Sequence, residues 1–106
     1  MTLPMTGKLV RDRIPELIRA SGTEPRTRVL GDDDFVASLR LKLVEEANEV
    51  HHATESELIE ELADVLEVIR ALAQTCGAAW ASVEQAAERK RQDRGGFEHR
   101  IWLEHQ

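Results

Sequence analysis

Four acidic residues, arranged as two pairs, are the most chemically distinctive feature of this sequence. Glu46 pairs with Glu49 and Glu61 with Asp64, three positions apart in each case. Residues three apart share a face of an α-helix, so each pair would present its two carboxylates together. Oxygen ligands without cysteine are the donor set that hard cations such as Mg²⁺ or Mn²⁺ prefer. The spacing therefore indicates a divalent-metal site, provided that the two helices are antiparallel neighbours.

Glu46 differs from an ordinary surface carboxylate in its position around the helix. At about 100° per residue, Glu46 lies roughly 20° from Leu39, inside an apolar arc, and Glu49 borders that arc. An ionised carboxylate directed at a core costs several kcal/mol unless it is paired or bound to metal. Acidic residues at this spacing more commonly mark a solvated face. We adopt that simpler interpretation for the acidic residues that lie elsewhere on these helices, which are Glu45, Glu57, Glu60 and Glu67.

Basic residues continue an apolar stripe on the last predicted helix. Lys90 and Arg94 follow Trp80, Val83 and Ala87 at helical spacing. Cations aligned with a core face suit a wall that faces phosphate groups. The alternative is that they only complement the negative end of the helix dipole.

Two further candidates for chemistry are weaker. Glu49 and His52 form half of a di-iron carboxylate pattern, but the next helix offers no second histidine. Cys76 continues an apolar stripe, so we expect it to be buried and inert. No phosphate-binding glycine loop or nucleophile elbow occurs in the sequence.

The elements that must position these residues are predicted to be helices. Ala, Leu, Glu and Arg dominate, aromatic residues make up 4% of the chain, and tyrosine is absent. Asp12 is a candidate N-cap for the first helix, and Asp33 or Asp34 for the second. Glycines end the first, third and fourth helices. Periodicity predicts helices over about residues 13–21, 33–53, 56–77 and 79–94.

The expected fold is therefore all-α, a bundle of about four helices. Two short segments, residues 26–30 and the stretch around Trp102, could add a two-stranded ladder. A chain of 106 residues has the length of a single domain, which we take to span residues 1–106.

Charge and composition exclude several classes of protein. Residues 31–67 carry two basic and twelve acidic side chains, whereas residues 1–30 carry six basic and three acidic ones. This acidic centre is unlike the basic footprint of a nucleic-acid binder. No apolar run approaches the ~18 residues of a membrane helix, and the N-terminus has no secretory apolar region. A single cysteine rules out an internal disulfide. Together, these features lead us to expect a cytoplasmic protein without a membrane partner.

The apolar stripe of the third predicted helix is long enough to suggest association. Its flank bears Glu61 at the edge and Val68 between the two acidic positions. A monomer of this size has few ways to cover both this stripe and the Trp80 stripe, so a homodimer is expected. The stripe consists of Leu58, Leu62, Val65, Ile69, Leu72 and Cys76.

With these residues identified, the chain resembles the MazG-like all-α nucleoside triphosphate pyrophosphohydrolases. Their pattern of E-E-x-x-E on one helix and E-x-x-D on the next matches Glu45, Glu46 and Glu49, followed by Glu61 and Asp64. The opening KLVRDRIPE and the closing KRQDRGGFEHRI resemble a compact branch often labelled phosphoribosyl-ATP pyrophosphohydrolase-like. The resemblance covers nearly the whole chain.

This resemblance implies a function and an assembly. Glu46, Glu49, Glu61 and Asp64 would be catalytic and would hold one or more Mg²⁺ ions, with Mn²⁺ as a substitute. The reaction would split the α–β phosphoanhydride of a nucleotide, giving the monophosphate and pyrophosphate. The family fold is completed by dimerisation, sometimes as a pair of dimers. The residues that would hold the substrate phosphates are Lys90, Arg94, Lys42, Arg11 and Lys8.

Two other functions stay open at this point. The histidine-biosynthesis enzyme that hydrolyses phosphoribosyl-ATP shares the fold, so that substrate is an alternative. A non-catalytic helical module for dimerisation or regulation is another, although such a module would not need Glu46 in its apolar arc.

Overall fold

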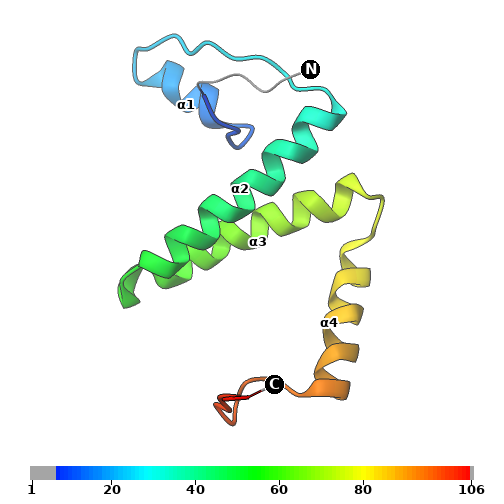
Figure 1. The fold of residues 1–106 in the computed structure, drawn as a ribbon. Coiled ribbons are helices and arrows are strands. Elements are labelled where there is room, and N and C mark those ends of the chain that lie inside the picture. Colours follow the sequence, from blue (N-terminus) through cyan, green and yellow to red (C-terminus); the bar gives the residue numbers. More distant parts are fainter. Residues whose placement is uncertain (1–6, 106) are drawn as a thin grey trace. The chain divides into compact units, whose positions relative to one another are not determined.

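The computed structural model describes residues 7–105, and these residues form four α-helices, one 3₁₀ turn and no strand (Figure 1). The expected all-α fold with four helices is confirmed. The chain divides into two compact units, residues 1–72 and 73–106. No helix in the described part of the chain is long and apolar enough to cross a bilayer. The elements are α1 (Ile14–Ala20), α2 (Asp32–His52), η1 (Glu55–Glu57), α3 (Leu58–Thr75) and α4 (Trp80–Arg94).

The first helix, α1, is short and begins after an irregular lead-in. Arg13 is its N-cap residue, so the prediction that Asp12 caps it is wrong. The Arg13 guanidinium instead donates from Nε to Oε1 of Glu16 at 2.6 Å, and Pro15 stands in the first turn, where its missing N–H is tolerated. Gly22 then adopts a φ of 98°, a left-handed conformation that ends the helix as predicted.

The second helix, α2, begins directly after Gly31, which is its N-cap residue. The prediction that Asp33 or Asp34 caps it is therefore wrong. Both lie in the first turn with Asp32, where negative side chains are favoured by the helix dipole. Asp34 is buried there.

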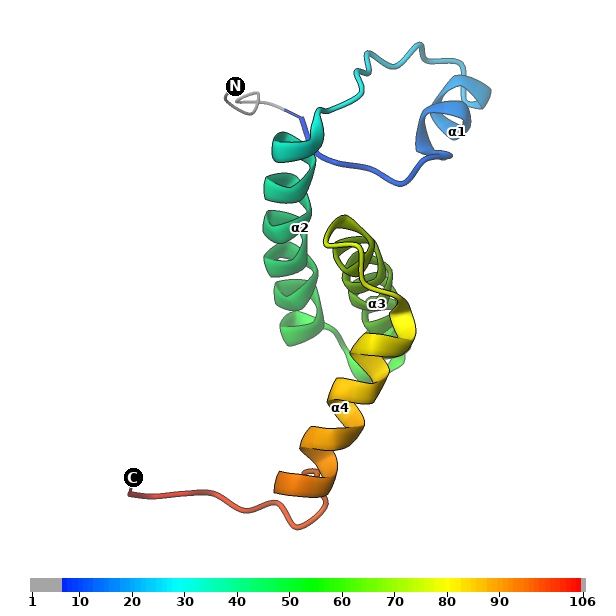
Figure 2. The same cartoon turned by 90° about the vertical axis from the view of Figure 1, so that its right-hand side faces the viewer.

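A tight capped turn joins α2 to α3. The backbone N–H and the hydroxyl of Thr54 both donate to Oε1 of Glu57, each at 2.9 Å, in a capping box. These two hydrogen bonds lower the pKa of Glu57. The turn reverses the chain, so α2 and α3 lie side by side and antiparallel, as two views agree (Figures 1 and 2). This hairpin is the arrangement that the paired acidic motif requires.

The apolar stripe of α3 and its acidic flank are covered to different extents. Val68, on the acidic flank, is buried, whereas Leu62 of the stripe is exposed. Cys76 is also exposed, which corrects the expectation that it is buried; its thiol donates to the carbonyl oxygen of Ala73. In the first unit, Leu39 of α2 is the other buried apolar side chain among the described residues. The core of the hairpin therefore lies along the flank that carries Glu61.

The second unit contains the end of α3, the turn at Gly77, α4 and the tail. Gly77 and Gly95 both have positive φ, and both end helices as predicted. No strand forms over residues 26–30 or around Trp102, so the predicted ladder is wrong. Val29 and Trp102 are almost fully exposed, and a two-stranded ladder without an apolar face to pack is marginal at best.

Candidate metal centre

The α2–α3 hairpin brings together three of the four acidic residues that the sequence singled out. One carboxylate oxygen from each of Glu46, Glu61 and Asp64 lies within 4.8 Å of the other two. Glu46 comes from α2, and Glu61 and Asp64 come from the first half of α3. Oxygens that share one Mg²⁺ at about 2.1 Å each stand up to roughly 4.2 Å apart. Small side-chain adjustments would therefore let the three carboxylates, an oxygen-only donor set, hold a hard cation.

Glu46 occupies the position that its place in the helical arc predicts. Its side chain is only 15% exposed, and its Oε1 lies 3.6 Å from Nζ of Lys42, one turn earlier on α2. Lys42 is itself half-buried. A carboxylate this far from water needs a positive partner, and Lys42 provides one.

Asp64 receives its positive partner from a distant part of the chain. Nη2 of Arg11 donates to Oδ1 of Asp64 at 2.8 Å, across 53 positions of sequence. Arg11 belongs to the irregular lead-in before α1, so this ion pair attaches the lead-in to α3. Both side chains keep about half of their exposure, which makes the pair accessible to water and to ligands.

Glu61 is the carboxylate most affected by its neighbours. Partial burial, followed by repulsion from Asp64, Glu49, Glu46 and Glu57, raises the pKa of Glu61 above its usual value of 4.5. The local field therefore favours either a proton or a cation at this position.

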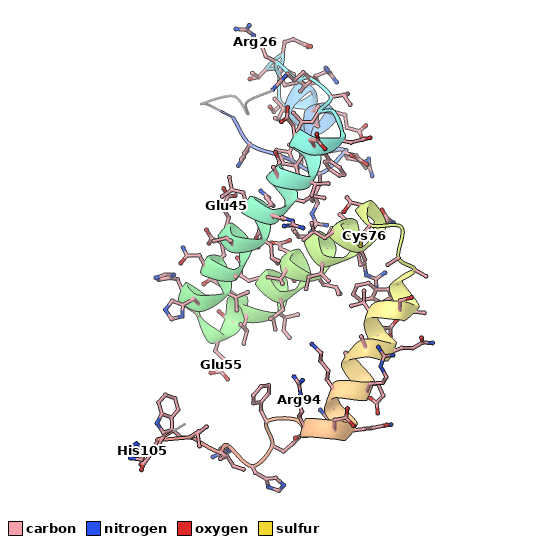
Figure 3. All side chains as sticks on the ribbon, turned by 45° about the vertical axis from the view of Figure 1, so that its right-hand side comes forward. Arg26, Glu45, Glu55, Cys76, Arg94 and His105 are labelled. Atoms are coloured by element: carbon pink, nitrogen blue, oxygen red, sulfur yellow. The ribbon has the colours of Figure 1, made fainter. Side chains whose placement is uncertain are left out.

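Glu49 stands apart from the other three carboxylates. It is exposed on α2 and does not belong to the three-carboxylate cluster, although its charge reaches Glu61. Glu45, labelled in Figure 3, is also exposed on α2, as the solvated interpretation predicts. Glu45 and Glu46 therefore differ in the structure, because only Glu46 is half-buried and belongs to the three-carboxylate cluster.

The histidines at the end of α2 do not form a metal site with Glu49. His51 and His52 are both exposed, and Nδ1 of His52 donates to the carbonyl oxygen of Asn48 at 2.9 Å. This hydrogen bond holds the His52 ring against its own helix rather than toward Glu49.

The predicted phosphate-binding residues fall into two groups. Arg11 and Lys42 lie at the carboxylate cluster, where each pairs with one of its acids. Lys8 is exposed in the lead-in. Lys90 and Arg94 are exposed on α4, in the second unit, and Figure 3 labels Arg94 at the end of that helix. A phosphate-binding role for these five residues stays a prediction.

Sequence reasoning missed the two ion pairs, although it named all four residues. Lys42 and Glu46 are four apart on one helix, a spacing that is visible in the sequence and typical of ion pairs. No comparable local signal joins Arg11 to Asp64, because their contact depends on how the lead-in folds back over α3.

Comparisons with known proteins give one partial match. A stretch of 46 residues, 43% of this chain, is 59% identical to an uncharacterized protein of Mycolicibacterium smegmatis. The aligned stretch spans 47% of that protein, less than half of its length. No family model matches the chain. No solved structure matches it either.

Proposed function

We propose that the protein is a divalent-metal-dependent nucleotide pyrophosphohydrolase. The observation that carries the proposal is the convergence of Glu46, Glu61 and Asp64 from two antiparallel helices. The substrate would be a nucleoside triphosphate or a related nucleotide in the cytoplasm, as the MazG-like resemblance implies. Water would attack the α-phosphorus, the bond from that phosphorus to the bridging oxygen would break, and pyrophosphate would leave.

Each residue of the site has a distinct part in this proposal. Glu46, Glu61 and Asp64 would hold Mg²⁺ or Mn²⁺, and Glu49, exposed on α2, would join them after a side-chain rotation. The bound ion supplies charge neutralisation at the phosphates and a more acidic water. Lys42 holds Glu46 in place through their ion pair.

A second copy of the chain completes the assembly in this proposal. The hairpin exposes large apolar side chains on the surfaces that α2 and α3 turn away from each other, namely Leu41, Val44, Ile59, Leu62 and Leu66. We refer to these five residues as the outer apolar residues; Leu41 and Val44 lie on α2, and the other three on α3. Leaving so much apolar surface in water is costly for a unit that buries few side chains. Association of two copies around a two-fold axis would cover one of these two surfaces.

The experiment is a product analysis with a panel of nucleotides. Purified protein is incubated with each nucleoside triphosphate, and with phosphoribosyl-ATP, in the presence of Mg²⁺. Pyrophosphate and the monophosphate are the expected products, and excess chelator should stop their release. Orthophosphate with a nucleoside diphosphate would mean that the β–γ bond is cut, which contradicts the assignment. Turnover of phosphoribosyl-ATP alone would select the alternative substrate.

A matched pair of variants identifies the site. Glu46→Gln should lose turnover, whereas Glu45→Gln, one position away and exposed, should keep it. Turnover that persists in full with chelator present would refute metal dependence.

A further inference from the structure

Two carboxylates of the cluster each carry a cation from the chain itself, but the two cations are held differently. Lys42 leaves the same helix as Glu46 one turn earlier, with its Nζ 3.6 Å from Oε1 of Glu46, and the two side chains are only 22% and 15% exposed. Arg11 reaches Asp64 from the irregular lead-in, and its side chain is 57% exposed. Lys42 is thus part of the scaffold, whereas Arg11 can leave Asp64 without unfolding a helix.

The ion pair with Arg11 occupies one of the two oxygens of Asp64, a member of the carboxylate cluster. Nη2 of Arg11 donates to Oδ1 of Asp64 at 2.8 Å. A guanidinium stays protonated at every physiological pH, so it cannot yield to a cation by losing its charge. Two positive groups at one carboxylate repel each other at short distance. Arg11 therefore opposes a metal ion at Asp64, and an ion that takes both oxygens of this carboxylate would displace it.

The displaced guanidinium has an obvious new partner. Phosphate groups bind arginine through two parallel, charge-assisted hydrogen bonds, at least as well as a carboxylate does. The substrate of the proposed reaction would bring its phosphates to the metal, and so into reach of the lead-in. Because Arg11 is half-exposed, the exchange requires no change in a buried contact.

We propose that Arg11 is an exchangeable counter-ion, which occupies Asp64 in the metal-free protein and passes to the phosphates of the metal-bound nucleotide. This inference rests on the proposed function. Arg11 then opposes binding of the metal alone and favours binding of metal together with nucleotide. The two ligands are consequently coupled, and each raises the affinity for the other.

The test measures Mn²⁺ binding by isothermal titration calorimetry for the wild-type protein, Arg11→Gln and Arg13→Gln. Arg13 is the matched control, because it loses the same charge two positions away and pairs with Glu16 outside the cluster. Arg11→Gln should bind Mn²⁺ roughly two- to five-fold more tightly than wild type, the factor expected when a competing exposed ion pair is removed. Arg13→Gln should resemble wild type.

A second titration uses Mn²⁺ with a nucleotide whose α–β bridging oxygen is replaced by a methylene group, which blocks the reaction. In this titration the ranking of the two variants should reverse: Arg11→Gln, the tighter binder of Mn²⁺ alone, should bind the Mn²⁺–nucleotide complex more weakly than Arg13→Gln does. A purely structural role for Arg11 would weaken both titrations and overturn the inference. Equal Mn²⁺ affinities for Arg11→Gln and Arg13→Gln would overturn it as well, leaving the metal site intact. Absence of Mn²⁺ binding to the wild-type protein would instead remove the proposed function and this inference together.

Discussion

On their inner sides, where α2 and α3 lie against each other, the two helices carry Glu46, Glu61 and Asp64. On their outer sides they carry the exposed residues Leu41 and Ile59. On each helix the acidic and the apolar positions are about 140–160° apart, by the ordinary helical advance. A hairpin that only had to be stable by itself would place these residues the other way round. Acidic residues thus lie between the helices, where apolar packing is expected, and apolar residues lie on the surface exposed to water.

The inner and outer sides of the hairpin are typical of two different kinds of binding surface. Three carboxylates that converge within 4.8 Å repel one another and lower the free energy of unfolding of the metal-free chain. Such an arrangement is typical of a site that is completed by a cation. An outer face of exposed leucine and isoleucine is typical of a surface that is completed by a second protein surface. We therefore propose partners of different kinds for the two sides, a cation for the carboxylates and a second copy of the chain for the exposed apolar residues.

The strongest way to break the comparison is to remove one acid from the inner side. Glu46→Gln, Glu61→Gln and Asp64→Asn should each lower kcat/KM by roughly 100-fold or more, above the 10–100-fold effect of losing an outer-shell partner of a metal. Pyrophosphate release under initial-rate conditions measures this loss, with Glu45→Gln as the control. Circular dichroism should show a retained helical fold, since removing one of several like charges relieves repulsion.

Glu49→Gln sharpens the same comparison, because Glu49 lies outside the cluster. Turnover should fall toward the level of Glu46→Gln, because the proposal has Glu49 rotate inward when the metal binds. Turnover close to wild type would restrict the metal ligands to the three acids that the hairpin already brings together.

The outer side is tested by placing a charge on it. Leu41→Glu should weaken the dimer by roughly 10- to 100-fold, since burial of one leucine contributes about 1.5–3 kcal/mol. Leu17→Glu on α1 is the matched control, because Leu17 and Leu41 are 57% and 56% exposed. Sedimentation at micromolar concentration measures the effect. A wild-type protein that sediments as a clean 12.0 kDa monomer would refute association altogether.

These two sides also show how far the sequence alone could predict the molecule. The helix bounds were predictable to within two residues, in part because Gly22, Gly77 and Gly95 end helices through local geometry. The inward position of Glu46 followed from the period of α2. Both features depend on residues close together in sequence, and such features are what periodicity and capping can reveal.

The rest depended on contacts that no local pattern determines. The stripe of α3 and its acidic flank both carry apolar residues in the sequence, yet Val68 on the flank is buried whereas Leu62 of the stripe is exposed. A stripe shows that a surface is apolar without showing whether this chain or another one covers it. The ion pair between Arg11 and Asp64 and the predicted ladder both involve segments far apart in sequence, so only the folded structure could decide them.

The capped turn between α2 and α3 holds the two helices together, so weakening it should lower the stability of the whole hairpin. Thr54→Ala removes one of the two hydrogen bonds to Glu57 and should lower the free energy of unfolding by about 1 kcal/mol. Thr54→Ser keeps the hydroxyl and should restore most of the loss. Urea denaturation measures both variants. Equal stability of Thr54→Ala and wild type would show that the capping box contributes little to the hairpin.

The smallest expected effect is the pH dependence of the metal-free protein, which reports the charge on the inner side alone. Partial burial and the nearby charges of Asp64, Glu49, Glu46 and Glu57 raise the pKa of Glu61 above 4.5, so the folded state holds this proton more tightly than the unfolded state does.

The sign of the effect follows from linkage. The contribution to stability is fully present below pH 4.5 and is lost as the pH rises through the raised pKa of Glu61. Glu61→Gln has no carboxyl proton to lose at this position. With chelator present, the melting temperature of Glu61→Gln minus that of wild type should therefore increase as the pH rises from 4.5 toward 7. Saturating Mg²⁺ should reverse the ranking, because wild type alone gains the full energy of metal binding. Parallel melting curves for the two proteins across this range would mean that Glu61 does not experience the field of the cluster.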